Sequence, residues 1–185
     1  TLFLTRGSFC SCGYRGVFSL WGTDFVVALT ENARIAETSD LENLERLALK
    51  SNEEVLQKRG GKTLSLQNPN YGQLEKLFQE AFIDEMAEVF VGTIDDSVVG
   101  YGVIREGSLQ DGTPHASIEA IYVEEEARSV GVGEIIMDRM LEWVRSRNIP
   151  AVDSLALPGD RQTKNFFETH GLVARAIIVQ KDLTK

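Results

Sequence analysis

The sequence predicts an α/β protein with a mixed, mostly antiparallel central sheet and helices on both faces. Residues 88–94 and 98–104 are apolar, β-prone runs on either side of the turn Asp95-Asp96-Ser97, which is typical of an antiparallel hairpin. Residues 118–123 form a third such run and lead through a glycine turn into an amphipathic helix. Residues 151–157 form a strand after that helix, and helical crossovers of this kind join strands of one sheet.

The first elements of this domain follow from local signals. Residues 33–37 predict a strand, and Thr38-Ser39-Asp40 then provides the Ser/Thr-plus-acid signature of a helix N-terminus. Leucines at helical spacing continue the helix to about Lys58, and Gly60-Gly61 ends it. A second helix is predicted over residues 71–84.

The C-terminal elements complete the sheet. A helix over residues 134–147 ends before Ile149-Pro150, because proline cannot continue it. A further helix is expected over residues 161–170, closed by Gly171, and a final strand over residues 173–180.

The chain divides at about residue 33. Residues 33–185 form the predicted domain, and residues 1–32 form an N-terminal extension to which we assign no function. Two arginines interrupt the apolar runs of this extension, which argues against a signal peptide and favours one or two strands packed on the domain.

Composition excludes several classes of protein. The 28 acidic and 19 basic residues give a net charge of −9, which argues against a nucleic-acid partner. No apolar run approaches the roughly 20 residues of a membrane span. Cys10 and Cys12 are the two cysteines, too few for a zinc site, so we expect reduced, catalytically idle thiols in a cytoplasmic protein.

The turn after residues 118–123 has the chemistry of a phosphate site. Glycines Gly131 and Gly133 let backbone N–H groups converge at the positive end of the following helix, and Arg128 adds a formal charge. A nucleotide P-loop is excluded because no lysine follows Gly133. A dinucleotide fingerprint, G-x-G-x-x-G, is excluded for two reasons. Ile136 occupies the position of its third glycine, and a seven-residue connector separates the strand from the first glycine.

The motif R-x-x-G-x-G, with its spacing from strand to helix, resembles the GCN5-related N-acetyltransferase (GNAT) superfamily. The resemblance covers roughly residues 33–183, most specifically 118–172, and implies a GNAT-like acyl-CoA N-acyltransferase fold with acetyl-CoA as cosubstrate. By this resemblance, the strand backbone binds pantetheine and the turn holds the pyrophosphate; the residues concerned are Ile121, Tyr122, Val123, Arg128, Ser129, Val130, Gly131, Val132, Gly133 and Glu134.

Glu119 is the candidate general base. A carboxylate in a strand that helices should cover on both faces is costly unless it has a partner or a task. Simple alternation places it on the same face as Ile121 and Val123, and related enzymes carry a base on this strand. A structural pairing with an arginine or lysine is the open alternative.

The chain departs from the family at the proton donor. The tyrosine usual on the last helix is Phe167 here, and the usual asparagine is Asp160. The thiolate then leaves unassisted, or another hydroxyl, Tyr122 or Tyr101, serves, or activity is weak or absent.

The sequence thus predicts an acetyl-CoA-dependent N-acetyltransferase that acts on a primary amine of a small molecule or peptide. A catalytically inactive CoA-binding sensor or structural module is the alternative, and transfer of a longer acyl group is a third. No metal is expected, and a homodimer is left open.

Overall fold

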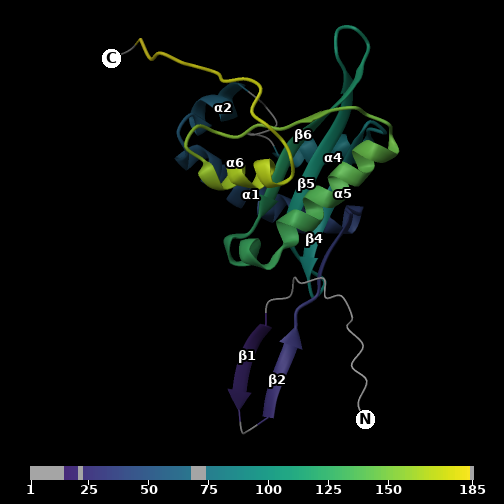
Figure 1. Cartoon of the computed structure of the whole chain (residues 1–185), viewed down its shortest axis with the longest axis vertical. Helices are drawn as coiled ribbons and strands as arrows, with labels where there is room; N and C mark the ends of the chain where they lie inside the picture. Colours follow the sequence, from purple (N-terminus) through teal and green to yellow (C-terminus); the bar gives the residue numbers. More distant parts are fainter. Residues whose placement is uncertain (1–14, 21–22, 68–73, 184–185) are drawn as a thin grey trace, which may run out of the picture.

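The computed structural model describes residues 15–20, 23–67 and 74–183 (Figure 1). Helices cover both faces of a five-stranded sheet in the order β3-β4-β5-β6-β7. The strands are β1 (Arg15–Leu20), β2 (Thr23–Ala28), β3 (Glu31–Ile35), β4 (Ala87–Ile94), β5 (Ser97–Ser108), β6 (Pro114–Val123) and β7 (Val152–Asp153). The helices are η1 (Thr38–Asp40), α1 (Leu41–Gln57), α2 (Gly61–Gln67), α4 (Leu74–Ile83), η2 (Glu125–Val130), α5 (Val132–Ser146) and α6 (Arg161–Thr169).

The sheet is antiparallel from β3 to β6, and β7 joins it parallel to β6. Asp95 and Asp96 connect β4 to β5 with φ angles of 45° and 66°. Two left-handed residues in a tight turn match the twist of the flanking strands. The predicted fold class, mixed and mostly antiparallel with helices on both faces, is confirmed.

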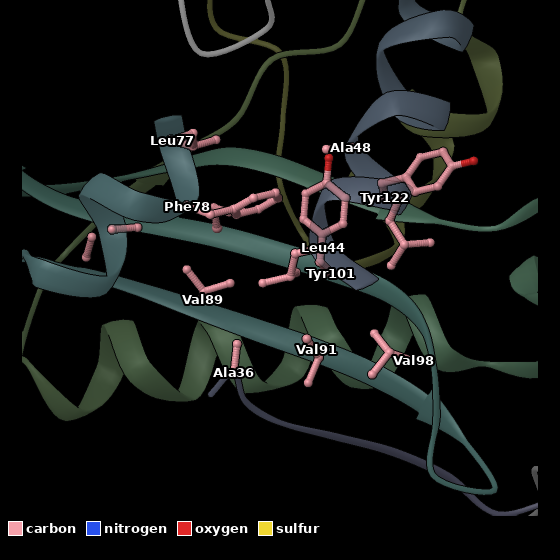
Figure 2. Packing of buried hydrophobic residues seen from close by; sticks show 14 residues of the cluster. Ala36, Leu44, Ala48, Leu77, Phe78, Val89, Val91, Val98, Tyr101 and Tyr122 are labelled. Carbon is pink, nitrogen blue, oxygen red and sulfur yellow. The ribbon is translucent and has the colours of Figure 1, made fainter. Parts of the chain in front are cut away.

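One face of the sheet packs against α1 and α4 (Figure 2). Tyr101 of β5 is fully buried there, and the ring of Phe78 meets it edge-on with centroids 5.2 Å apart. Leu44 of α1 and Val89 of β4 complete the same cluster. This packing fixes α1 over β5 and β6, with its C-terminal half beside the end of β6.

The opposite face lies unusually close to α5. A Cβ atom on Gly92 would lie 2.5 Å from Cγ1 of Val132, and one on Gly102 would lie 2.8 Å from Cγ2 of Ile136. Only glycine leaves room for a helix at this distance. The close approach places the N-terminus of α5 beside the end of β6, where a Cβ on Gly133 would lie 3.6 Å from Cγ2 of Val123.

An ion pair between the exposed Arg34 and the buried Asp40 fixes the start of α1. The Asp40 carboxylate accepts hydrogen bonds from Arg34 at 2.7 and 2.9 Å and from the Glu37 N–H at 2.8 Å. The hydrogen bonds from Arg34 lower the pKa of Asp40. The Thr-Ser-Asp signature therefore does mark the helix start, through Asp40 and a 3₁₀ turn.

One predicted strand is much shorter than expected, and another does not form. The expected strand 151–157 is reduced to Val152–Asp153, because only these residues pair with β6. Residues 173–180 form no strand, and their apolar side chains are exposed: 81% for Val173 and 87% for Val179. α2 was not predicted, because Gly60-Gly61 was interpreted only as a helix stop.

The N-terminal extension contains two strands, as its apolar runs suggested. β1 and β2 pair antiparallel in a sheet of their own, which Figure 1 shows extending away from the five-stranded sheet. These strands do not join the five-stranded sheet, and the packing of the extension on the domain stays a prediction. Cys10, Cys12 and the predicted start of the second helix lie outside the described residues.

Candidate active site

The site is built where β6 and β7 part. Their parallel pairing joins only Ala116 to Val152 and Ser117 to Asp153. Beyond these pairs, residues 118–123 of β6 line a pocket of about 230 Å³ together with Ser154, Leu155 and Leu157. Pockets that enclose a drug-sized ligand usually measure roughly 300–1,000 Å³, so a ligand as long as CoA would lie partly outside it.

Among the strands that the structure describes, none pairs with the edge of β6 that faces the pocket. Ile121, Tyr122 and Val123 pair with β5 on one side only. The Val123 carbonyl accepts a hydrogen bond from Nε of Arg128 at 2.8 Å. The backbone predicted to hold pantetheine therefore does line the pocket, with strand pairing left open on that side.

The glycine turn adopts the geometry of an anion socket. Gly131 has φ 92°, a left-handed conformation, and serves as the N-cap of α5 without any side-chain cap. A Cβ there would meet nothing within 4 Å, so glycine is needed for its conformation and not for space. The first helical bond is donated by the Ile135 N–H to the Gly131 carbonyl at 3.2 Å. The N–H groups of the three preceding residues, Val132, Gly133 and Glu134, thus have no helical acceptor.

The other predicted turn residues occupy different environments. Gly131, Gly133, Glu134 and Arg128 line the pocket. The Val132 side chain is fully buried between α5 and the sheet, Val130 is half-buried and Ser129 is exposed. These three residues could contribute only backbone, or in the case of Ser129 a hydroxyl, to an anion.

Arg128 is held by contacts that the sequence did not indicate. Its guanidinium donates to the Glu54 carboxylate of α1 at 2.6 Å and stacks 5.4 Å from the centroid of the Tyr122 ring. Glu54 also accepts a hydrogen bond from the Tyr122 hydroxyl at 3.0 Å. Since Glu54 lies 74 residues before Arg128, only the packing of α1 on the sheet reveals this cluster.

Glu119 lies in a β-bulge. Ile104 of β5 faces Ile118 and Val103 faces Ala120, so Glu119 is the extra residue in β6 with nothing opposite it. The bulge breaks the alternation of β6. Ile121 packs with the α5 face, whereas Glu119 pairs with Arg105, which in turn binds Asp84 after α4 on the other face. The prediction that Glu119 shares a face with Ile121 and Val123 is therefore wrong.

The two oxygens of the Glu119 carboxylate lie in different environments. Oε1 accepts a hydrogen bond from Nε of Arg105 at 3.1 Å. Oε2 is buried and makes no hydrogen bond to any described residue, and the side chain is 15% exposed. Glu119 also lines the pocket. Glu119 therefore has both features: Oε1 makes the structural pairing with an arginine that is the open alternative, and Oε2 is an unpaired oxygen at the pocket among the described residues.

Neither of the two tyrosines that the structure describes, Tyr101 and Tyr122, replaces the missing tyrosine. Phe167 is buried and lines the pocket. Tyr101 is fully buried in the α1 and α4 cluster. Burial, with the nearby Glu54 carboxylate, raises the pKa of Tyr122 to about 12. Because a thiol has a pKa of about 8.5, proton transfer from Tyr122 to a thiolate is uphill.

Asp160, at the position of the family's asparagine, caps α6. Its carboxylate accepts from the Thr163 N–H at 3.1 Å and from Nζ of Lys58 at 2.7 Å. The residue therefore anchors α6 to the end of α1 and helps to close the pocket.

Comparison with known families agrees with this geometry. The sequence model described as "Acetyltransferase (GNAT) family" matches residues 47–172. This match spans more than half of the chain, from α1 through the glycine turn to α6. The chain belongs to the GNAT acetyltransferase family, which makes it an acyltransferase with acetyl-CoA as cosubstrate.

Solved structures of low identity share the fold. A protein of Clostridium acetobutylicum, described as a predicted acetyltransferase with acetyl-CoA, is 13% identical with a TM-score of 0.63, covering 83% of this chain and 97% of that one. A transcriptional regulator of Bacillus halodurans C-125 is 18% identical with a TM-score of 0.62, covering 83% and 100%. The ribosomal-protein-alanine N-acetyltransferase of Brucella melitensis biovar Abortus 2308 is 14% identical with a TM-score of 0.59, covering 83% and 100%.

No curated protein sequence matches the chain. Within the described residues, no helix has the length and apolar character to span a bilayer, and no cluster of three or more metal-ligating side chains occurs.

Proposed function

We propose that this protein transfers an acetyl group from acetyl-CoA to a primary amine of a small molecule or peptide. Glu119 is the general base, directly or through one water molecule. The thioester binds between β6 and the chain after β7, and the glycine turn holds the pyrophosphate.

The chemistry requires two protons to be removed from the acceptor nitrogen. An alkyl amine has a pKa near 10 and attacks only when neutral, so the carboxylate of Glu119 first accepts the ammonium proton and passes it to solvent. The amine nitrogen then bonds to the thioester carbonyl carbon, the C–S bond breaks, and CoA leaves as a thiolate. The second proton, which the nitrogen still carries after the attack, leaves by the same route through Glu119 to solvent. Phe167 supplies no proton to the thiolate, which leaves unassisted.

The observation that carries this proposal is the bulge at Glu119. An extra residue in a strand re-aims a side chain, and here the re-aimed group is a carboxylate on the wall of the pocket. One of its oxygens is buried without a hydrogen bond from the described residues. Such an oxygen is costly in a folded protein, and a proton-accepting role accounts for it.

A CoA-binding module without acyl transfer is the second candidate. It is favoured by Phe167, which cannot protonate a thiolate, and the same fold occurs in the protein described as a transcriptional regulator. The two candidates share the cofactor site and differ in what Glu119 does.

Glu119→Gln separates them. The variant keeps the shape and the acceptor for Arg105 but removes the basicity. We expect turnover to fall about 10²- to 10⁴-fold, with acetyl-CoA affinity by calorimetry within about twofold of wild type. The acidic limb of the pH–rate profile should also flatten.

Glu106→Gln is the matched control. Glu106 of β5 is likewise paired with an arginine, Arg147, at 2.9 Å, but it does not line the pocket. It should keep wild-type turnover. Turnover of folded Glu119→Gln within about threefold of wild type, less than 1 kcal/mol of barrier, would exclude Glu119 as the base. A wild type that binds CoA but acetylates no amine would support the binding module.

A further inference from the structure

We propose that Glu54 binds a positively charged group of the acceptor, and that Arg128 covers this carboxylate until the cofactor's pyrophosphate draws the guanidinium away. The inference rests on the proposed function and adds a specificity-determining residue outside the glycine motif. It predicts an acceptor with a second cationic group besides the reacting amine.

The first step is the position of Glu54. It lies in the last part of α1, lines the pocket, and its side chain is 35% exposed. Its Oε1 accepts from the Arg128 guanidinium at 2.6 Å and from the Tyr122 hydroxyl at 3.0 Å. Both donors border the pocket, so the carboxylate is at the site, and among the described residues Arg128 is the cation paired with it.

The second step is a competition for Arg128. This residue lies three positions before Gly131, at the opening of the anion socket, and its Nε is anchored to the Val123 carbonyl. A pyrophosphate carries more charge than a carboxylate, and an arginine fork binds phosphate oxygens through several parallel hydrogen bonds. A pyrophosphate at the turn therefore competes with Glu54 for the guanidinium, and Glu54 lowers the apparent affinity for the cofactor.

The third step is to identify which pocket carboxylate is left without a cation when Arg128 binds the pyrophosphate. The other pocket cation among the described residues, Lys58, is paired with Asp160 at 2.7 Å. Glu119 has Arg105 as its partner. Once Arg128 turns to the pyrophosphate, Glu54 is the pocket carboxylate that loses its cation, with the Tyr122 hydroxyl still oriented toward it. A half-buried carboxylate in this state favours a positively charged ligand.

The fourth step is the spacing from the reacting centre. Glu119 lies three residues before Tyr122, at most roughly 10 Å along the strand, and the bulge at Glu119 shortens this path. The amine that attacks near Glu119 must be neutral, so a cation at Glu54 is a different group of the acceptor. A short diamine satisfies both requirements.

Calorimetry with CoA and 1,4-diaminobutane as probes tests this coupling. Glu54→Gln should bind CoA about three- to tenfold more tightly than wild type, because the internal competitor is gone, as expected for a partly exposed ion pair. In wild type, bound CoA should increase the affinity for the diamine. In Glu54→Gln, the affinity of the CoA-loaded protein for the diamine should fall about tenfold.

Two variants make the comparison specific. Glu53→Gln removes the same charge from the adjacent, exposed position of α1, which does not line the pocket, and should behave like wild type. Glu54→Asp keeps the charge and should retain part of the diamine affinity.

The outcomes separate the two proposals. A wild type that binds no CoA overturns the proposed function and this inference with it. If wild type binds CoA, but folded Glu54→Gln binds it no more tightly, the inference alone is overturned. It is also overturned if CoA increases the diamine affinity equally in wild type and in Glu54→Gln.

Discussion

The two halves of β6 differ in what surrounds them. In the first half, Ala116 and Ser117 pair with both β5 and β7, and Ala116 is fully buried and donates its N–H to the Ala151 carbonyl at 3.0 Å. The second half, from Ile118, pairs with β5 alone and lines the pocket. Glu119 and its bulge mark the junction.

This difference shows how one strand can serve both stability and binding. Backbone groups that are paired on both sides are satisfied by the protein, whereas an open strand edge must be satisfied by water or by a ligand. Substitutions in the closed half should therefore affect folding, and those at the open half should affect the cofactor.

The largest effect is expected at the turn that follows the open half. Gly131→Val forces a β-branched residue to φ 92° or displaces the N–H groups of the socket. CoA affinity should fall more than about 100-fold, about 2.7 kcal/mol, as measured by calorimetry.

Gly112→Val is its control. Gly112 has φ 83° with nothing within 4 Å, in the loop between β5 and β6 and away from the pocket. It carries the same backbone strain, about 1–3 kcal/mol, and should bind CoA as wild type does. Unchanged affinity in folded Gly131→Val would refute the socket.

The closed half should show the opposite behaviour. Ala116→Leu overpacks a fully buried position, and such insertions usually cost about 1–3 kcal/mol. Urea denaturation should show this loss of unfolding free energy, while the folded variant should keep wild-type CoA affinity. A large loss of affinity without a loss of stability would contradict the division of β6.

A smaller effect is expected where the open half contacts α1. Tyr122→Phe removes the hydroxyl that donates to Glu54 and should lower the unfolding free energy by about 1 kcal/mol. Turnover should stay within about threefold of wild type, because a phenol with a pKa of about 12 is a weak acid toward a thiolate. A 100-fold loss of kcat would instead identify Tyr122 as the proton donor.

The smallest effect is expected beside the closed half, at Asp153 of β7. Hydrogen bonds from Arg175, and then the His115 ring, whose Nε2 lies 3.0 Å from Oδ2, lower the pKa of Asp153 from 3.8 to about 2. A lowered folded-state pKa stabilises the protein above about pH 4, and this contribution is lost as the pH falls toward 2. Because Arg175 is 69% exposed, the contribution should be below about 1 kcal/mol.

Asp153→Asn tests this pH dependence. Thermal unfolding should give a slightly lower Tm for the variant above pH 4 and converge with wild type toward pH 2. A difference that grows as the pH falls would mean that the sign of the linkage is wrong.

Local signals predicted most elements well. The hairpin turn at Asp95-Asp96, the acid-rich start of α1 and the glycine turn before α5 all act through residues within one or two turns of each other. Their identities could therefore be inferred from the sequence. Nothing local distinguished residues 173–180 from a strand, because a β-prone run forms a strand only where a neighbour offers pairing.

The sequence by itself thus determined the order of most elements, the family, the phosphate-type turn and the candidate base Glu119, since each depends on neighbouring residues. Only the tertiary structure decided how these parts meet. The bulge at Glu119 depends on the register of β5 against β6, and the short β7 depends on where two strands part. The Arg128–Glu54 contact depends on a helix 74 residues away. Each is fixed by which distant surfaces pack together, and that information is not contained in any single stretch of the chain.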